Sequence, residues 1–100
     1  MSFKKWDHEF DGAFTNPNSL KPAAGVYVIW CDPGKYWIVL DVGESENVVE
    51  RIKNHDRADC WRRNCSGNIY YSATYISDQT DRIDLEYRIR SQERVACGEE

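Results

Sequence analysis

Five side chains of types that handle protons, phosphates or metal ions fall between residues 27 and 86. The phenol of Tyr27 can serve as a general base or orient a water molecule when a cation lies nearby. Asp41 interrupts an apolar run, and a buried carboxylate needs a donor, a cation or water beside it. Arg51 and His55 are four residues apart, so one helix presents both on one face. The structural alternatives are a core tyrosine and a strand-end aspartate that reaches solvent.

The fifth such residue is Glu86, within a segment of helical character at residues 80–95. Apolar pairs spaced four residues apart bracket it, and we expect these pairs to face inward. They are Ile83 with Tyr87 and Leu85 with Ile89. A carboxylate so bracketed is either a rim residue or a ligand, and the rim is the simpler interpretation.

A basic band between residues 50 and 63 stands out in an acidic chain of 100 residues and net charge −4. The overall charge argues against a protein that coats nucleic acid through bulk attraction. The band itself carries +2 and the remainder −6. A charge run is usually a solvated face, but one beside Arg51 and His55 indicates a phosphate-binding surface. The candidate nucleic-acid-binding residues are Lys53, Arg57, Arg62 and Arg63.

The four cysteines, Cys31, Cys60, Cys65 and Cys97, are expected to be reduced thiols in a cytoplasmic protein. The sequence contains neither an apolar stretch of the signal-peptide kind nor a run of the roughly 20 apolar residues that a membrane helix needs. A zinc site on His55, Cys60 and Cys65 is the less favoured alternative, because structural zinc sites usually contain a CxxC pair.

The elements that must position these residues follow from composition. Two β-branched and aromatic runs, residues 25–31 and 36–42, flank a Pro-Gly turn and predict a β-hairpin. Both runs are apolar on both faces, so the hairpin should be covered on both sides. A helix is expected over residues 46–55, with Ser45 as its N-cap.

Three further elements are expected after this helix. They are a second short helix at 59–64 anchored by Trp61, a third strand at 68–76, and a last helix at 80–95 capped by Asp78 or Thr80. The predicted fold is therefore a small α/β domain, residues 23–97, with a three-stranded antiparallel or mixed sheet flanked by helices (β-β-α-α-β-α). Residues 1–22 are expected to be a lead-in, either a short helix or an arm pinned to the core by its aromatic residues.

The order of the candidate residues resembles the GIY-YIG nuclease superfamily. Gly25-Val26-Tyr27 is similar to the GIY element. Asp41-Val42-Gly43 occupies the place of YIG, with Asp41 instead of the tyrosine. Arg51 falls at the spacing of the family arginine and His55 one turn further on, while Glu86 matches the helix glutamate that binds the metal. The resemblance covers about residues 24–90.

The resemblance implies a metal-dependent endonuclease acting on DNA more readily than on RNA. A divalent ion, usually Mg²⁺, would be held by Glu86 and contact the scissile phosphate. Tyr27, assisted by His55, would help to deprotonate the attacking water, and Arg51 would neutralise the charged phosphate. Asp41 would line the site and hold a cation or accept a proton.

The alternative function is a non-catalytic module of the same fold that binds nucleic acid or a protein partner, having lost the YIG tyrosine. In either case the small basic band predicts that nucleic acid binds locally and weakly. A partner protein is then expected to supply the remaining DNA binding.

Overall fold

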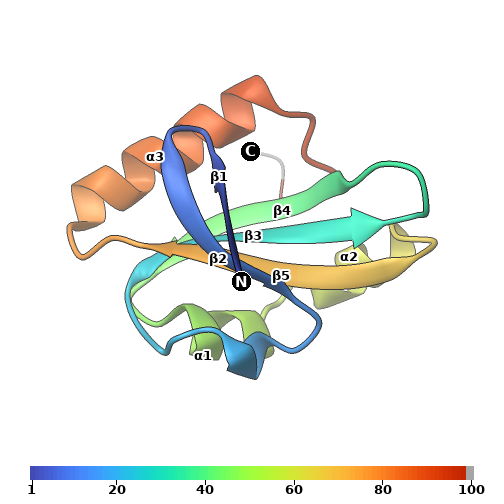
Figure 1. Cartoon of the computed structure of the whole chain (residues 1–100), viewed down its shortest axis with the longest axis horizontal. Helices are drawn as coiled ribbons and strands as arrows, with labels where there is room; N and C mark the ends of the chain where they lie inside the picture. The colour runs from blue at the N-terminus through green and yellow to red at the C-terminus, as the bar shows by residue number, and fades with distance from the viewer. Residues whose placement is uncertain (99–100) are drawn as a thin grey trace.

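The computed structural model describes residues 1–98 and contains a five-stranded antiparallel sheet in the order β1-β2-β5-β3-β4 (Figure 1). The strands are β1 (Ser2–Lys5), β2 (His8–Phe14), β3 (Gly25–Asp32), β4 (Ile38–Ser45) and β5 (Asn68–Tyr75). The predicted hairpin of β3 and β4 is confirmed, and β3 lies between β4 and β5.

Helices cover both faces of this sheet (Figure 1). The short helices α1 (Val48–Lys53) and α2 (Ala58–Arg63), with the 3₁₀ turn η1 (Pro17–Ser19), lie on one face, and α3 (Gln79–Gln92) lies on the other. Alternate residues of β3 therefore enter two separate cores. Tyr27 and Ile29 pack with α1 and α2, whereas Val26 and Val28 pack with α3. The expected cover on both sides is confirmed, and the α/β class with it.

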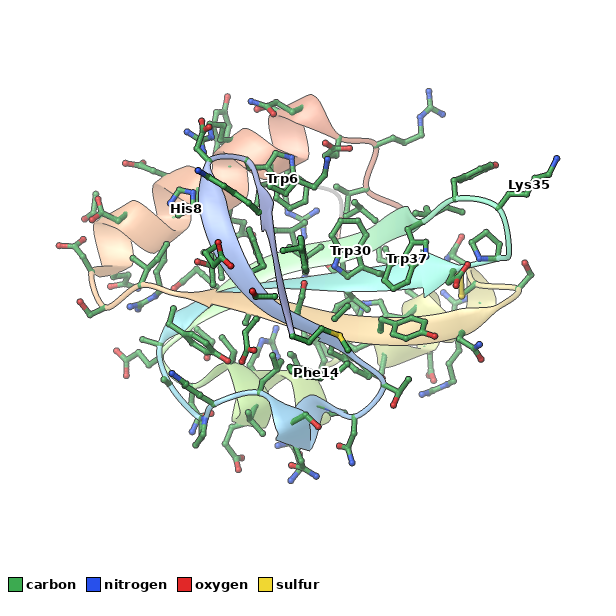
Figure 2. The ribbon with its side chains drawn as sticks, in the orientation of Figure 1. Trp6, His8, Phe14, Trp30, Lys35 and Trp37 are labelled. Carbon is green, nitrogen blue, oxygen red and sulfur yellow. A yellow bond between two sulfur atoms is a disulfide. The ribbon has the colours of Figure 1, made fainter. Side chains whose placement is uncertain are left out.

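The sheet has five strands where the sequence predicted three. The two additional strands come from the segment expected as a helix or an arm. Phe3 pairs with Phe10 across the β1–β2 hairpin with their rings stacked at 5.4 Å, and Trp6 in the turn stacks on Trp30 at 5.9 Å. Figure 2 shows Trp6, Trp30 and Trp37 close together beside this hairpin. The three-to-four spacing of the aromatic residues reflects a tight hairpin and not a helix.

Strand β4 runs to Ser45, beyond its predicted end, and the helix after it is shorter than expected. Asn47 caps α1 by accepting a hydrogen bond from the backbone N–H of Glu50, so Ser45 is not the cap. Ser45 instead bonds to the backbone of Asn47 and shapes the turn. A β-bulge in β4 leaves Leu40 without a partner in β3, because Asp41 pairs with Ile29 and Val39 pairs with Trp30.

Helix α3 begins after Asp78, whose side chain accepts from the backbone N–H of Asp81, as predicted for that cap. Leu85 and Ile89 are buried against the sheet, but Ile83 and Tyr87 are 48 % and 75 % exposed. The prediction that both apolar pairs face inward is therefore wrong for one of them. A helix on a sheet buries only one stripe.

All four cysteines are paired, so the prediction of free thiols is wrong. The disulfides are Cys31–Cys65 and Cys60–Cys97, with Cα–Cα distances of 5.6 and 6.1 Å. Cys60 and Cys65 are thereby engaged in different bonds and do not supply the thiolates that the zinc alternative required. Across residues 1–98, the helices are all too short or too polar to cross a membrane.

Candidate active site

The phenol of Tyr27 and the imidazole of His55 form a hydrogen-bonded pair, with 2.7 Å between the tyrosine hydroxyl and Nε2. Tyr27 comes from β3 and His55 from the loop between α1 and α2, so the prediction that one helix carries both Arg51 and His55 is wrong, because α1 ends at Lys53. The backbone N–H of Arg57 donates to His55 Nδ1 at 3.1 Å. This assigns the proton of the neutral ring to Nε2, which then donates to the Tyr27 oxygen. The phenol O–H is left to orient another group.

Burial holds both members of this pair in their neutral forms. It lowers the pKa of His55 to about 4, and the positive charges of Arg51 and Arg57 lower it in the same direction. Burial likewise raises the pKa of Tyr27 to about 12, while the charge of Arg51 opposes the rise. The pKa of the phenol also responds to Asp41, Arg57 and Glu86, which places these charges within electrostatic reach of the hydroxyl.

Gly43 in β4 lies directly beside the Tyr27 ring. Tyr27 pairs with Gly43 across the β3–β4 ladder, and a Cβ atom at this position would collide with the phenol hydroxyl. The absence of a side chain is therefore what allows the hydroxyl to reach His55. Close approach is the reason for glycine here, not an unusual backbone angle.

Asp41 is fully buried and all of its oxygen atoms have donors. Arg57 binds it through two nitrogens at 2.8 and 3.2 Å, and Arg90 of α3 binds it at 2.7 Å. Trp61 Nε1 and the backbone N–H of Val42 each donate at 2.8 Å. This arrangement leaves Asp41 no free lone pair facing solvent. The expectation that a buried Asp41 has donors and a cation beside it is confirmed, and the alternative of a strand-end residue that reaches solvent is wrong.

Arg90 connects this network to Glu86. Its Nε atom faces Glu86 Oε2 at 3.4 Å, one helical turn away on α3. The Glu86 side chain is 28 % exposed. Burial raises its pKa, although the charge of Arg90 opposes the rise. The other carboxylate in the neighbourhood, Glu44, is occupied by the buried Arg82 at 2.8 Å. Glu86 is thus the carboxylate of this region with the weakest arginine contact.

Three arginines of the basic band form ion pairs within the protein. Arg51 pairs with Asp56 at 3.2 Å, and Arg62 pairs with Asp59. Arg57 turns inward to Asp41. Arg62 is largely exposed, as a solvated band predicts, whereas Arg57 is bound to a buried carboxylate that sequence spacing does not reveal.

Lys53 and Arg63 are exposed. Within residues 1–98 neither takes part in an ion pair. They are the members of the band best placed to meet an added phosphate group.

Arg90 and Trp61 are the site residues that the sequence did not identify as such. Arg90 stands four residues after Glu86, a spacing that places both on one helix face. That spacing was a usable signal for the pair. The approach of Arg90 and Trp61 to Asp41 depends on how α3 and α2 pack against the edge strand β4, which no local pattern encodes.

A divalent metal ion at Glu86, implied by the resemblance, is compatible with the residues present. Among residues 1–98, no cluster of three or more His, Cys, Asp or Glu side chains is arranged around a common point. Mg²⁺ does not require one, since it commonly uses one or two carboxylates together with waters and substrate phosphates. The half-buried carboxylate of Glu86 can fill that role, with Arg90 as its competitor.

Comparisons of the chain with models of known families, with curated proteins and with solved structures found no match.

Proposed function

We propose that this protein is a metal-dependent phosphodiesterase of the endonuclease type, acting on DNA, with a GIY-YIG-like arrangement of β3, β4, α1 and α3. The observation that carries the proposal is the Tyr27–His55 hydrogen bond of 2.7 Å, set among the charges of Arg51, Arg57 and Glu86. A neutral phenol held by an imidazole, with the charges of two arginines acting on it, suits the orientation of a water molecule beside a phosphate.

In this proposal the chain divides the work among four side chains. His55 holds the Tyr27 oxygen through its Nε2 proton, and the neutral phenol, whose own O–H is left free, orients the attacking water beside the phosphate. Arg51 leaves its exposed partner Asp56 at little cost and binds the phosphate oxygens. Glu86 would hold the metal ion, which when bound supplies positive charge to the phosphate.

A nicking assay with supercoiled plasmid in Mg²⁺ or Mn²⁺ tests the proposal. The wild type should convert the plasmid to the open circle, and Glu86→Gln should lose this activity by about 100-fold or more. The matched control is Asp84→Asn, which removes an equivalent charge from an exposed position of the same helix. Equal cleavage by wild type and Glu86→Gln would overturn the assignment of Glu86.

A non-catalytic module that binds nucleic acid is the second candidate. Two observations favour it: Tyr27 is only 1 % exposed, and Asp41 occupies the YIG tyrosine position as a buried anchor for arginines. This candidate predicts salt-sensitive DNA binding without cleavage. Arg62→Ala with Arg63→Ala should weaken that binding, whereas loss of cleavage by Glu86→Gln would contradict the module.

The cellular setting is part of the same proposal. DNA is the expected substrate, and the single weak basic band argues for a partner protein that supplies further DNA contacts. The cytoplasmic location predicted from the sequence stays a prediction, and the two disulfides are more typical of an oxidising compartment.

A further inference from the structure

A cavity of about 470 Å³ lies beside the candidate active site, between α1, α2 and the middle of β5. Figure 1 shows α1 and α2 on the face of the sheet opposite α3. The apolar lining of the cavity includes Ile52, Trp61 and Tyr71. The ring centroids of Trp61 and Tyr71 are 6.5 Å apart. Lys53 and Arg62 bring two positive charges to the same cavity. An apolar, aromatic lining with two cations is the chemistry of a site for a nucleobase and its phosphate.

The two cations are available to an incoming anion. Lys53 is exposed and has no ion pair within residues 1–98. The partner of Arg62 is Asp59, and both side chains of that pair are about two-thirds or more exposed. Exposed pairs of this kind are worth little, so Arg62 can exchange Asp59 for a phosphate.

Trp61 links the cavity to the candidate active site. Its ring is 4.8 Å from the ring of His55, and its Nε1 donates to Asp41 at 2.8 Å. Trp61 therefore contacts the candidate active site on one side and lines the cavity on the other.

We propose that this cavity receives an unpaired base of the nucleic-acid strand, so that the protein selects single-stranded or frayed substrates over intact duplex. The proposal rests on the proposed function, since it names the substrate class of the same site. A base within a duplex is stacked on both faces and must pay for unstacking before it can enter, whereas an unpaired base need not. Tyr71, partly buried on β5, lines the cavity and supplies the aromatic ring for such a base.

Metal-free binding of oligonucleotides that carry 2-aminopurine tests this directly, because the fluorescence of that base is quenched when it stacks on an aromatic ring. The single strand should bind more tightly than the matching duplex and be quenched. A single strand with an abasic position in place of 2-aminopurine should bind at least about fivefold more weakly. Tyr71→Leu should weaken single-strand binding by a similar factor, and Tyr71→Phe should retain it.

The charge contribution has its own matched pair of variants. Lys53→Gln should weaken single-strand binding more than Arg63→Gln does, because Arg63 belongs to the same basic band but does not line the cavity. Equal effects of the two variants, or equal binding of the base-containing and abasic strands by the wild type, would overturn the proposal. The abasic comparison keeps the test decisive even if a Tyr71 variant fails to fold.

Failure of this inference and failure of the proposed function give different results. Base-dependent binding without any cleavage in Mg²⁺ or Mn²⁺ would overturn the nuclease and leave the cavity assigned. Cleavage that favours duplex and is indifferent to Tyr71→Leu would overturn the cavity and leave the nuclease.

Discussion

His55 and Tyr27 form a polar pair inside the apolar layer between the sheet and α1. The exposed fraction of His55 is 7 % and that of Tyr27 is 1 %. The pair is stable there because each ring satisfies the other and the backbone N–H of Arg57 satisfies the remaining nitrogen. Protonation of His55 would add a charge to this buried pair. Acid should therefore lower the free energy of unfolding through this residue.

Lowering the pH from 7 to about 4 should therefore destabilise the fold by up to about 3 kcal/mol through His55. The imidazole takes up its proton near pH 6.5 in the unfolded chain but near pH 4 in the folded protein. Between these values the unfolded state binds more protons, so the free energy of unfolding falls with falling pH. Urea unfolding of wild type and His55→Gln should show a shallower pH dependence in the variant. The control is His8→Gln in the β1–β2 hairpin. If the free energy of unfolding of His55→Gln depends on pH as steeply as that of wild type, His55 is not the group through which acid destabilises the fold.

Asp41 is expected to matter for stability more than any exposed carboxylate. Asp41→Asn removes the charge that compensates Arg57 and Arg90, and we expect a loss of about 3 kcal/mol of unfolding free energy. Asp56→Asn, which breaks the exposed pair with Arg51, should cost less than about 1 kcal/mol. Chemical denaturation measures both. A cost for Asp41→Asn as small as that for Asp56→Asn would show that Asp41 does not anchor the arginines.

Among the elements, those with strong local patterns were predictable from the sequence and the β1–β2 hairpin was not. The β-branched residues around a Pro-Gly turn predict strands β3 and β4, and the Asp78 cap predicts the start of α3. The hairpin turn at Trp6 and Asp7 has φ angles of 51° and 64° on residues that are not glycine or asparagine. The usual turn signal is therefore missing.

The same distinction holds for the candidate site. The side chains of Tyr27, His55 and Glu86 were identifiable by residue type and order. The disulfide pairing and the reach of Arg90 to Asp41 depend on which distant segments pack together, and spacing alone does not fix a cysteine pairing.

Strand β2 should behave as part of the core and not as an appendage. Phe10 is fully buried between the Phe3 and Trp6 rings, at centroid distances of 5.4 and 5.6 Å. Phe10→Ala is expected to cost about 3 to 5 kcal/mol in guanidinium unfolding. Tyr36→Ala, at a side chain that is 67 % exposed, should cost less than about 0.5 kcal/mol. Similar costs for the two variants would place the hairpin outside the cooperative core.

The Cys60–Cys97 disulfide ties residues 96–98 to α2 across the edge of β4. The backbone N–H groups of Ala96 and Cys97 donate to Val39 and Leu40 at 3.3 and 2.8 Å. The chain beyond the bond meets Arg57 and Arg90 at Gly98. This disulfide thus closes the edge strand beside the arginine network.

Removing either disulfide should cost about 4 kcal/mol, because the sequence separations of 34 and 37 residues close loops of similar entropy. The paired replacement Cys60→Ser with Cys97→Ser should in addition accelerate amide hydrogen exchange at residues 96 and 97. The control pair, Cys31→Ser with Cys65→Ser, should leave exchange at these two amides close to that of the rest of the sheet. Equal exchange in both variants would contradict the closure of the edge by Cys97.

For the whole molecule, the charge distribution sets how nucleic acid can be held. The net charge is −4, and ion pairs within the protein engage Arg51, Arg57 and Arg62 of the basic band. Binding should accordingly be weak, and its affinity should fall only modestly with salt because few phosphates are contacted. It should also be local to the basic band on α1 and α2 and to the adjoining edge strand β4, where Glu86 of α3 lies near Arg57.

The cleavage rate of Tyr27→Phe relative to wild type decides whether the Tyr27–His55 pair is catalytic, because this change removes one oxygen atom and keeps the ring. Single-turnover cleavage of DNA in Mg²⁺ or Mn²⁺ should be slower in the variant by about 100-fold or more, with DNA affinity little changed. Cleavage by Tyr27→Phe at the wild-type rate, or a wild type that binds DNA and never cleaves it, would contradict the assignment of the Tyr27–His55 pair to catalysis.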